Sequence, residues 1–334
     1  MTALFIISGF AKGGGKNAYL SIVEAFKRKH CKIIIISFGP KSGANYLKFK
    51  KLTNDIFEYQ IFEITKIFFF LKKIKFDFIF VDAFYPTLIF RFLQFFKLIN
   101  KKIIYRYGAI TYNKTIDFIY PILLSNQNIF VPAENLKSHL INKCIVKPKS
   151  INVIINHIPI KQNNNFKVYK KLNNSFLTVS RNVPRKRLER VIELSNKLTD
   201  YNFKVIGGGK LLNDFKNRTV NMLNIDFLGQ INDPVPYYLK SKIYFLPSRG
   251  EGFSYSIFEA LFYKCTVIVY DDLGGNNFYL KDNPNYLIIN DLNKDYMTIL
   301  DFISKPFVKY DIDFIPTQKE MGDNYYNKII ELLN

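Results

Sequence analysis

Short apolar runs alternate along this chain with longer segments in which apolar residues recur every three or four positions. The runs ALFIIS (3–8), KIIIISF (32–38) and DFIFVDA (77–83) are almost continuously apolar, which is typical of strands buried on both faces of a sheet. The segment between the first two, residues 16–29, has helical periodicity instead. Repeated alternation of this kind predicts parallel sheets with helices on both faces, and therefore an α/β fold.

The first half of the chain contains a series of such predicted elements. We expect strands at 3–8, 32–38, 77–83, 102–107, 128–132 and 151–155, with helices at 16–29, 63–73, 87–99 and 134–142. The pattern breaks at PIKQNNNFKVYKKLNN (159–174), whose Asn- and Lys-rich composition is typical of an interdomain linker.

The alternation resumes after this linker. We expect strands at 175–180, 202–209, 224–229, 242–248, 266–272 and 285–290, with helices at 186–199, between 209 and 224, just after Pro234, from about 254 and at 317–333. The sequence therefore predicts two Rossmann-like α/β domains, over 1–160 and 161–316, and a terminal helix over 317–334.

The composition supports two folded domains. Hydrophobic residues make up 48% of the 334 positions, which is enough for two cores. Lys and Arg number 48 against 27 Asp and Glu, so the net charge is +21. A surface this basic attracts nucleic acid, anionic lipid headgroups or phosphorylated substrates, and the charge alone does not choose among these partners.

Neither a metal site nor a disulfide framework is indicated. The three cysteines are widely spaced without a CxxC motif, and the three histidines are scattered, so we expect no metal and no cofactor. The run MTALFIISGF lacks the basic start and cleavage site of a signal peptide, and we interpret it as the first strand. Because no long uncharged apolar run occurs, we expect a cytoplasmic protein without a membrane-spanning helix.

Two cations follow the first predicted strand of the second domain. Arg181 lies at the carboxyl end of strand 175–180, and Lys186 lies at the expected start of the next helix. Open α/β sheets bind ligands at this edge, so the pair is placed to hold a diphosphate, although a solvated helix start is the alternative. Gly207 begins the turn of VIGGGK, which fits either close approach to a ligand or a plain tight turn.

The stretch PSRGEGFSYSIFEALFYK (247–264) places Glu251 in a loop and Glu259 in the first turns of the following helix. A carboxylate accepts well from neighbouring sugar hydroxyls, so one glutamate can hold a transferred sugar and the other a ribose. Free N–H groups at the start of the helix would then face the phosphates between them. The further donor-binding candidates in this stretch are Gly252, Phe253, Ser254 and Tyr255, with Ser254 or Ser256 as the N-cap.

These motifs resemble those of retaining glycosyltransferases of family 4, which have the GT-B fold. PSRGEGFSYSIFEALFYKCTVIV (247–269) is similar to the Glu-x7-Glu signature of that family, and VSRNVPRKRLERVIE (179–193) is similar to its strand–Arg–x4–Lys segment. In the first half the looser matches are SGFAKGGGKNAYLSIVEAF (8–26), VPAENLKSHL (131–140) and NVIINHIPI (152–160).

The resemblance implies two Rossmann-like domains facing a cleft, with the acceptor side on 1–160 and the nucleotide-sugar donor on 161–316. It also implies that the last helix crosses back to the first domain, and that transfer needs no metal and retains the anomeric configuration. Glu251 would contact the sugar, Glu259 the ribose, and Arg181 and Lys186 the diphosphate.

The glycine loop before the first helix is a further candidate. The N–H groups of Gly14 and Gly15 can contact donor phosphate or acceptor, or the loop can be a tight strand-to-helix turn, and the residues fit both interpretations.

The chain departs from the family pattern at several positions. YRYGA (105–109) has Tyr107 where many members have a His before the Gly, so we expect Tyr107 and Arg106 to serve the acceptor side. Three further departures are Ser254 for the second Gly of an EGFG loop, Arg187 for the Gly that follows the Lys, and Asn276 and Asn277 near an expected Glu. These differences leave the identity of the sugar open.

Two segments combine aromatic residues with Lys and Arg, namely ITKIFFFLKKIKF (64–76) and FYPTLIFRFLQFFKLINKK (84–102). Such helices can lie on an anionic membrane near a lipid-linked acceptor, or can cover the first sheet with their basic ends in water. The net charge favours peripheral contact at the inner face of the plasma membrane.

The combined prediction is a hexosyltransferase that transfers a sugar from a nucleotide-diphosphate donor to a growing surface glycan. We expect the donor to be a UDP-sugar. The acceptor would be a glycan or lipid-linked glycan of the lipopolysaccharide, O-antigen or capsule type. The alternative is a basic nucleic-acid-binding or other nucleotide-dependent α/β protein without transferase activity. No GxGxxG fingerprint occurs, which argues against a nicotinamide-dependent oxidoreductase. No nucleic-acid-binding module occurs either, so we expect no nucleic-acid partner. We discount DID (311–313) as a metal site because it lies in a Pro-flanked segment.

Overall fold

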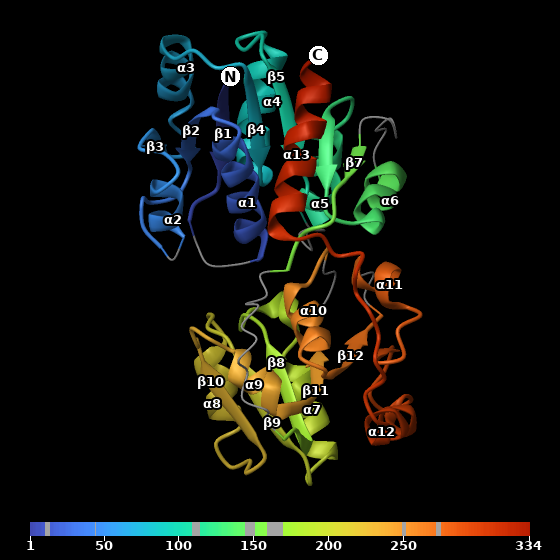
Figure 1. Cartoon of the computed structure of the whole chain (residues 1–334). Coiled ribbons are helices and arrows are strands. Elements are labelled where there is room, and N and C mark those ends of the chain that lie inside the picture. Colours follow the sequence, from blue (N-terminus) through green and yellow to red (C-terminus); the bar gives the residue numbers. More distant parts are fainter. Residues whose placement is uncertain are drawn as a thin grey trace. The chain divides into compact units, whose positions relative to one another are not determined.

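The structure is a computed structural model, and it describes residues 1–10, 14–43, 45–108, 114–143, 151–158, 170–248, 252–271 and 275–334. The chain divides into two units, one of Met1–Pro159 with Phe314–Asn334 and the other of Ile160–Asp313 (Figure 1).

The first unit is built on a seven-stranded parallel sheet in the order β3-β2-β1-β4-β5-β6-β7. Its strands are β1 (Thr2–Ile7), β2 (Lys32–Ser37), β3 (Ile56–Glu58), β4 (Phe78–Asp82), β5 (Lys102–Arg106), β6 (Asn128–Val131) and β7 (Ile151–Val153). The connecting helices are α1 (Gly14–Arg28), α2 (Tyr46–Lys50), α3 (Ile64–Lys73), α4 (Phe84–Phe95), α5 (Lys114–Leu123) and α6 (Glu134–Lys143).

Both faces of this sheet are covered, as the continuous apolar strands require. Successive side chains of a strand point to opposite faces, so Leu4 and Ile6 pack in the core that α3, α4, α5 and α6 complete. Phe5 points to the other face, where its ring meets the rings of Tyr19 and Phe26 of α1.

The last helix, α13 (Gln318–Leu333), also belongs to the first unit, where it lies beside α1 (Figure 1). A capping box between Thr317 and Glu320 fixes its start, because each side chain accepts from the other residue's backbone N–H. The two helices approach closely at Gly322, where an added Cβ would lie 2.8 Å from the carbonyl oxygen of Ser21. The ring of Tyr325 packs on Phe130, so α13 completes the cover over this face of the sheet.

The second unit is built on a six-stranded parallel sheet in the order β10-β9-β8-β11-β12-β13. Its strands are β8 (Leu172–Val179), β9 (Asn202–Ile206), β10 (Ile225–Gly229), β11 (Ser241–Leu246), β12 (Thr266–Tyr270) and β13 (Tyr286–Ile289). Its helices are the 3₁₀ turn η2 (Pro184–Lys186), α7 (Glu189–Lys197), α8 (Leu212–Arg218), α9 (Val235–Lys240), α10 (Tyr255–Phe262), α11 (Gly275–Leu280) and α12 (Tyr296–Ser304).

The prediction of two Rossmann-like α/β units is confirmed, and the structure corrects several element boundaries. Residues 172–174, expected in the linker, belong to β8, because Lys171 anchors the strand start by donating to the carbonyl oxygens of Tyr238 (2.9 Å) and Ser241 (2.6 Å). The helix expected from 186 begins at Glu189, after η2, and the helix expected at 87–99 is α4, which starts and ends earlier.

Several short elements were not expected from the sequence, namely α2, β3, α5, α11 and α12. Strand β3 has only three residues, and α5 contains Pro121, so both lack a clear local signal. Their backbone is held by neighbours that the tertiary structure supplies, such as the pairing of β3 with β2.

Candidate functional site

Strand order reverses at one point in each sheet. In the second sheet β8 continues to β9 and β10 on one side, and the chain then returns to place β11 on the other side of β8. The loops after β8 and β11 leave neighbouring strands in opposite directions, and this is where open α/β sheets bind ligands. The two second-domain motifs singled out in the sequence follow these two strands.

The loop after β8 carries the two predicted cations. Arg181 is exposed two residues beyond the strand, and Lys186 is half-buried as the last residue of η2. The turn η2 ends at Arg187, whose φ of +52° and ψ of +38° are left-handed. This is the position where the resembled family usually has glycine, so Arg187 adopts a conformation that favours glycine.

The glycines after β9 form the floor of this loop. Gly207 has a φ of +144°, and a Cβ there would lie 1.8 Å from the carbonyl oxygen of Ser180. Gly209 has a φ of +150°, and a Cβ there would lie 2.4 Å from the carbonyl oxygen of Asn182. The N–H of Gly207 donates to the carbonyl of Gly229 at 2.8 Å, so this glycine supports the cation loop and its N–H is already engaged.

Arg190 in the first turn of α7 was not found from the sequence, and it connects α7 to the loop after β11. Its Nη1 donates to the carbonyl oxygen of Pro247 at 3.1 Å, immediately after β11. Its guanidinium carbon lies 3.6 Å from the centroid of the Tyr270 ring. A cation stacked and hydrogen-bonded in this way fixes the start of α7 against the ends of β11 and β12.

The helix after β11 starts where the sequence predicted. Ser254 is the N-cap of α10, with extended backbone angles and its side chain 3.2 Å from that of Ser256. The N–H of Ser254 donates to Oδ1 of the buried Asn276 at 2.9 Å. Asn276 therefore already accepts from one of the N–H groups that were predicted to face a phosphate.

The remaining described candidates of this loop are apolar or partly buried. Gly252 is buried, Phe253 is buried against the ring of Phe258 at 4.6 Å between centroids, and Tyr255 is half-buried at the first position of α10. Glu251, the predicted sugar contact, lies outside the described residues.

Glu259 lies in α10, half-buried, and accepts a hydrogen bond of 3.0 Å from the hydroxyl of Tyr238. Loss of hydration raises the pKa of Glu259 to about 7, and the Tyr238 hydrogen bond acts in the opposite direction. Tyr238 is fully buried in α9 and was not found from the sequence. The pair presents a carboxyl group that is poised to change charge near neutral pH.

Two buried hydroxyl groups lie at the same edge of the sheet. Ser180 follows β8 and Ser248 follows β11, and neither Oγ has a hydrogen-bond partner among the described residues. Buried polar atoms normally have partners, so these hydroxyls mark a place where a ligand or water can donate or accept.

The first sheet reverses its order between β1 and β4, and polar side chains gather there too. Lys16, in the first turn of α1, donates to Oγ of Ser8 at 2.9 Å and to Oδ2 of Asp82 at 3.4 Å. Gly14 is the first residue of α1, and a Cβ on Gly15 would meet nothing within 4 Å, so the helix start is open at Gly15.

The two residues predicted for the acceptor side are buried. Arg106 is 2% exposed and donates to Oδ1 of Asp82 and Oδ1 of Asn156, each at 3.3 Å. Tyr107 is fully buried, with its ring against those of Tyr120 and His139. This burial favours roles within the first unit over direct contact with an acceptor.

The part of the chain that the structure describes contains no group of three His, Cys, Asp or Glu side chains that could hold a metal ion. Asp311 and Asp313 of the DID segment are exposed in the irregular stretch between α12 and α13. Among the helices of the described ranges, none has the length and apolar character needed to cross a membrane.

Two Rossmann-like α/β units, each built on a parallel sheet, are the architecture of the GT-B class, and solved structures of that class resemble the whole chain. The apo form of the lipopolysaccharide outer core galactosyltransferase WaaB has a TM-score of 0.72 at 17% identity, and the alignment covers 99% of both chains. Anabaena Alr3699/HepE in complex with UDP has a TM-score of 0.71 at 12% identity, covering 99% of this chain and 100% of that one. At these identities the likeness establishes the fold.

The sequence of the second unit is similar to that of a known protein family. Residues 160–301, which lie in the second unit, match the family model described as glycosyl transferases group 1. The capsular polysaccharide biosynthesis glycosyltransferase CapH of Staphylococcus aureus is 27% identical over 190 residues, which are 54% of this chain. The match spans only half of the length of CapH. The resemblance to glycosyltransferases noted in the sequence is thus confirmed at the level of group 1, and the assignment to family 4 stays a prediction.

Proposed function

We propose that this protein is a retaining glycosyltransferase of the family 4 type, which transfers a sugar from a nucleotide-diphosphate donor to a growing surface glycan. The observation that carries the proposal is the edge of the second sheet. There Arg181 and Lys186 follow β8, and the start of α10 and Glu259 follow the neighbouring strand β11. The group 1 domain match covers all of these residues.

The donor would bind across this edge. Arg181 and Lys186 supply positive charge for the diphosphate, and the N–H groups at the start of α10 supply donors. Glu259 accepts from the ribose hydroxyls once it is deprotonated, and Glu251 accepts from hydroxyls of the sugar. Asn276 must release the N–H of Ser254 if a phosphate oxygen is to take it.

The chemistry follows from where charge develops. As the bond between the sugar C1 and the phosphate oxygen breaks, negative charge grows on the leaving diphosphate. Arg181, Lys186 and the α10 N–H groups stabilise that charge more strongly than they stabilise the neutral bond, which lowers the barrier. The acceptor oxygen attacks C1 from the same face and passes its proton to the leaving phosphate, so configuration is retained.

We propose a UDP-sugar as donor and a glycan or lipid-linked glycan of the lipopolysaccharide, O-antigen or capsule type as acceptor. The names of CapH and WaaB, which refer to capsular polysaccharide and to the lipopolysaccharide outer core, support this class of acceptor. The net charge of +21 and the exposed aromatic side chains of α3 and α4 support peripheral contact with anionic membrane.

The test is donor binding and turnover in matched variants. Arg181→Ala and Lys186→Ala should each weaken UDP binding, measured by calorimetry, by roughly tenfold or more, because a charge-assisted contact to phosphate is lost. Arg185→Ala removes an equal charge from the same 3₁₀ turn and is the control. Glu251→Gln should bind UDP normally but lose nucleotide release from the sugar donor.

Equal effects of all three cation variants would contradict the site. Stabilisation of the protein against heat by a single-stranded oligonucleotide, without any by UDP or GDP, would favour the nucleic-acid-binding alternative.

A further inference from the structure

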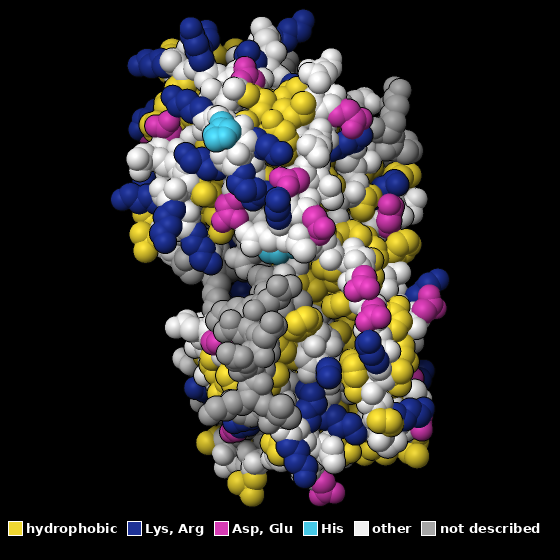
Figure 2. All heavy atoms as spheres, viewed as in Figure 1, with side chains coloured by type: hydrophobic (Ala, Val, Ile, Leu, Met, Phe, Trp, Pro, Cys, Tyr) yellow, Lys and Arg dark blue, Asp and Glu magenta, His cyan; other side chains and the backbone are white. Residues whose placement is uncertain are grey.

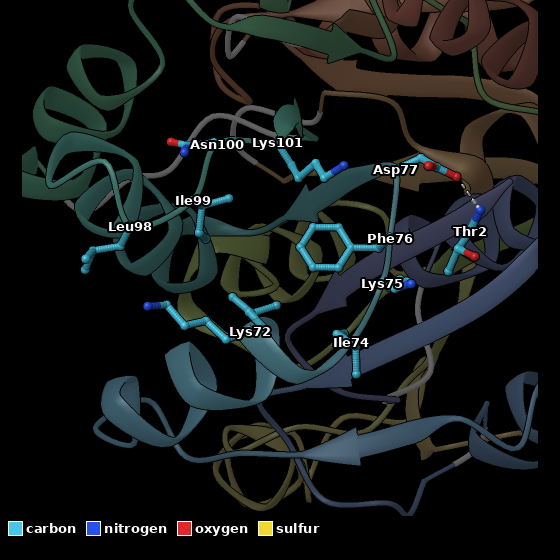
Figure 3. Close-up of a pocket in the computed structure, with 11 residues that line it drawn as sticks. Thr2, Lys72, Ile74, Lys75, Phe76, Asp77, Leu98, Ile99, Asn100 and Lys101 are labelled. Carbon is cyan, nitrogen blue, oxygen red and sulfur yellow. Dashed lines mark hydrogen bonds between the residues drawn. The ribbon is translucent and has the colours of Figure 1, made fainter.

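A cavity of about 440 Å³ opens on the first unit, away from the edge that carries Lys16 and Asp82. It is lined by the end of α3 and by the segments that lead into β1, β4 and β5, so it lies at the amino-terminal edge of the sheet. Figure 3 shows these segments converging around the ring of Phe76. Parallel strands place this edge opposite the carboxyl ends, and the transfer chemistry proposed above does not use it.

Three lysines line the cavity, namely Lys72, Lys75 and Lys101 (Figure 3). All three are exposed, and within the described ranges none has a carboxylate within ion-pair distance. The one acidic residue of the lining, Asp77, accepts a hydrogen bond of 2.7 Å from the N–H of Thr2. The lining therefore carries an excess of positive charge.

The floor of the cavity is apolar. Leu71, Phe76 and Ile99 line it and are each less than a tenth exposed. A ligand that fits both the apolar floor and the three exposed lysines needs an anionic group next to hydrocarbon. A phosphate ester attached to an acyl glycerol has this combination.

Exposed aromatic side chains lie on α3, whose end lines the cavity, and at the end of α4, which precedes the lining segment 98–101. Phe95 at the end of α4 is 79% exposed and Phe69 on α3 is 61% exposed. Phe96, next to the cavity-lining segment that starts at Leu98, packs against Phe92 (4.7 Å) and Phe95 (5.2 Å). Figure 2 shows Lys and Arg side chains at the surface together with hydrophobic ones over α2 and α3.

We propose that this cavity binds the phosphate headgroup of an anionic phospholipid while Phe69, Phe95 and Phe96 enter the membrane interface beside it. Aromatic side chains next to lysines are characteristic of membrane–water interfaces. The rings of Phe95 and Phe96 meet edge to face at 87°, so they do not form the flat platform on which bases of a single-stranded nucleic acid stack. The inference rests on the proposed membrane contact but is independent of the proposed transfer chemistry.

The test is flotation of the full chain with vesicles of phosphatidylcholine alone or of phosphatidylcholine with phosphatidylglycerol. We expect binding to the second vesicle only. The variant K72Q/K75Q/K101Q should lower the partition coefficient at least about tenfold, since each lysine near an anionic surface contributes appreciably. The control K48Q/K50Q/K51Q removes the same charge from exposed lysines on and just after α2, outside the cavity, and should bind nearly as well as the unchanged chain.

A second variant, Phe95→Ser with Phe96→Ser, distinguishes insertion of aromatic side chains from attraction by charge. It should weaken flotation with the vesicles but leave the dependence of flotation on salt concentration unchanged. Equal losses in the cavity and control variants would overturn the proposal in favour of general surface charge. Displacement of the protein from vesicles by millimolar sn-glycerol 3-phosphate supports the cavity, whereas binding of that compound without any flotation would overturn the lipid assignment. Thermal stabilisation by UDP, measured on every variant, reports separately whether the proposed donor site fails.

Discussion

At the scale of single residues, the environment of Glu259 determines what its carboxyl group can do. The residue is half-buried, and its carboxyl group accepts a hydrogen bond of 3.0 Å from the Tyr238 hydroxyl. Burial raises the pKa of Glu259 from 4.5 to about 7, so near neutral pH the carboxyl is divided between its acid and its carboxylate form. Only the carboxylate offers all its oxygen lone pairs to the hydroxyls of a ribose.

We therefore expect donor binding to depend on pH through Glu259. Because the raised pKa keeps a proton on the group below pH 7, the affinity for UDP should fall about tenfold between about pH 8 and about pH 6. Glu259→Gln should bind UDP more weakly at high pH, and its affinity should lose the pH dependence that Glu259 causes. Calorimetric titration of both proteins measures this, because the titration of UDP itself contributes equally to the two and drops out of their comparison. Tyr238→Phe removes the hydrogen bond that lowers the pKa of Glu259, so the midpoint of the change in UDP affinity with pH should move to higher pH. If the pH dependence of UDP affinity is unchanged in both variants, Glu259 does not have the proposed role.

Arg187 has a large side chain in a backbone conformation that favours glycine. Its left-handed backbone is unfavourable for a side chain by roughly 1–2 kcal/mol, and its Nε lies 3.5 Å from Oε1 of Glu189. The conformation turns the chain from η2 into α7, so it sets the position of Lys186.

We expect Arg187→Gly to change the free energy of unfolding by no more than about 1 kcal/mol, because relief of the left-handed strain offsets the greater freedom of glycine in the unfolded chain. Arg187→Val should destabilise by about 2 kcal/mol, because a β-branched side chain tolerates this conformation poorly. Urea denaturation measures both, and similar stabilities for the two variants would contradict the strained geometry.

At the scale of elements, two glycine turns that look alike in the sequence have different surroundings. Gly207 is pressed against the carbonyl of Ser180, whereas a Cβ on Gly15 meets open space. The turn after β9 thus serves the packing of two strand ends, and the first turn of α1 leaves room for a ligand at Gly15.

Because of this difference, the two glycines should respond differently to substitution by alanine. Gly207→Ala should lower the free energy of unfolding by at least about 2 kcal/mol, since the added Cβ would overlap backbone atoms at 1.8 Å. Gly15→Ala should leave stability unchanged or raise it by up to about 1 kcal/mol, since alanine favours a helix more than glycine does. A loss of transferase activity in a fully stable Gly15→Ala would indicate that a ligand uses the open space, and retained activity would assign the glycine to the turn alone.

At the scale of the whole molecule, the first unit depends on residues from the far end of the chain. Met321, Tyr325 and Ile329 of α13 are fully buried there, and Arg28 of α1 forms an ion pair of 3.0 Å with Asp323. The core of the first unit is completed only after all of the second unit has been synthesised.

A chain ending at Asp313 should therefore lose much of the stability of its first unit. Burial of three large apolar side chains contributes about 5–8 kcal/mol, which is comparable to the whole stability of many domains. Calorimetric melting should show an early or absent transition for the first unit, with the UDP-dependent transition of the second unit retained. The milder Gly322→Ala, whose Cβ would lie 2.9 Å from that of Ala25, should lower the first transition only. Melting of the shortened chain at the normal temperature would show that α13 is dispensable.

Much of this architecture could be predicted from patterns that are local in the sequence. The continuous apolar strands indicated parallel sheets, Ser254 was one of two N-cap candidates and is the N-cap in the structure, and the segment from Glu251 to Glu259 indicated a glycosyltransferase. What escaped prediction depends on distant contacts. The early start of β8 requires Lys171 to meet Tyr238 and Ser241, and the link from Arg190 to Pro247 joins residues far apart in the chain.

The sequence by itself determined the class of fold, the order of the main elements and the identity of the charged residues after β8 and β11, because periodicity and motif spacing are written along the chain. The tertiary structure alone decided which polar side chains are accessible. It buried Arg106 beside Asp82, engaged the N–H of Ser254 with Asn276, and placed Tyr238 next to Glu259. Burial and hydrogen-bond partners are set by neighbours in space, and those neighbours follow from the packing of the whole unit.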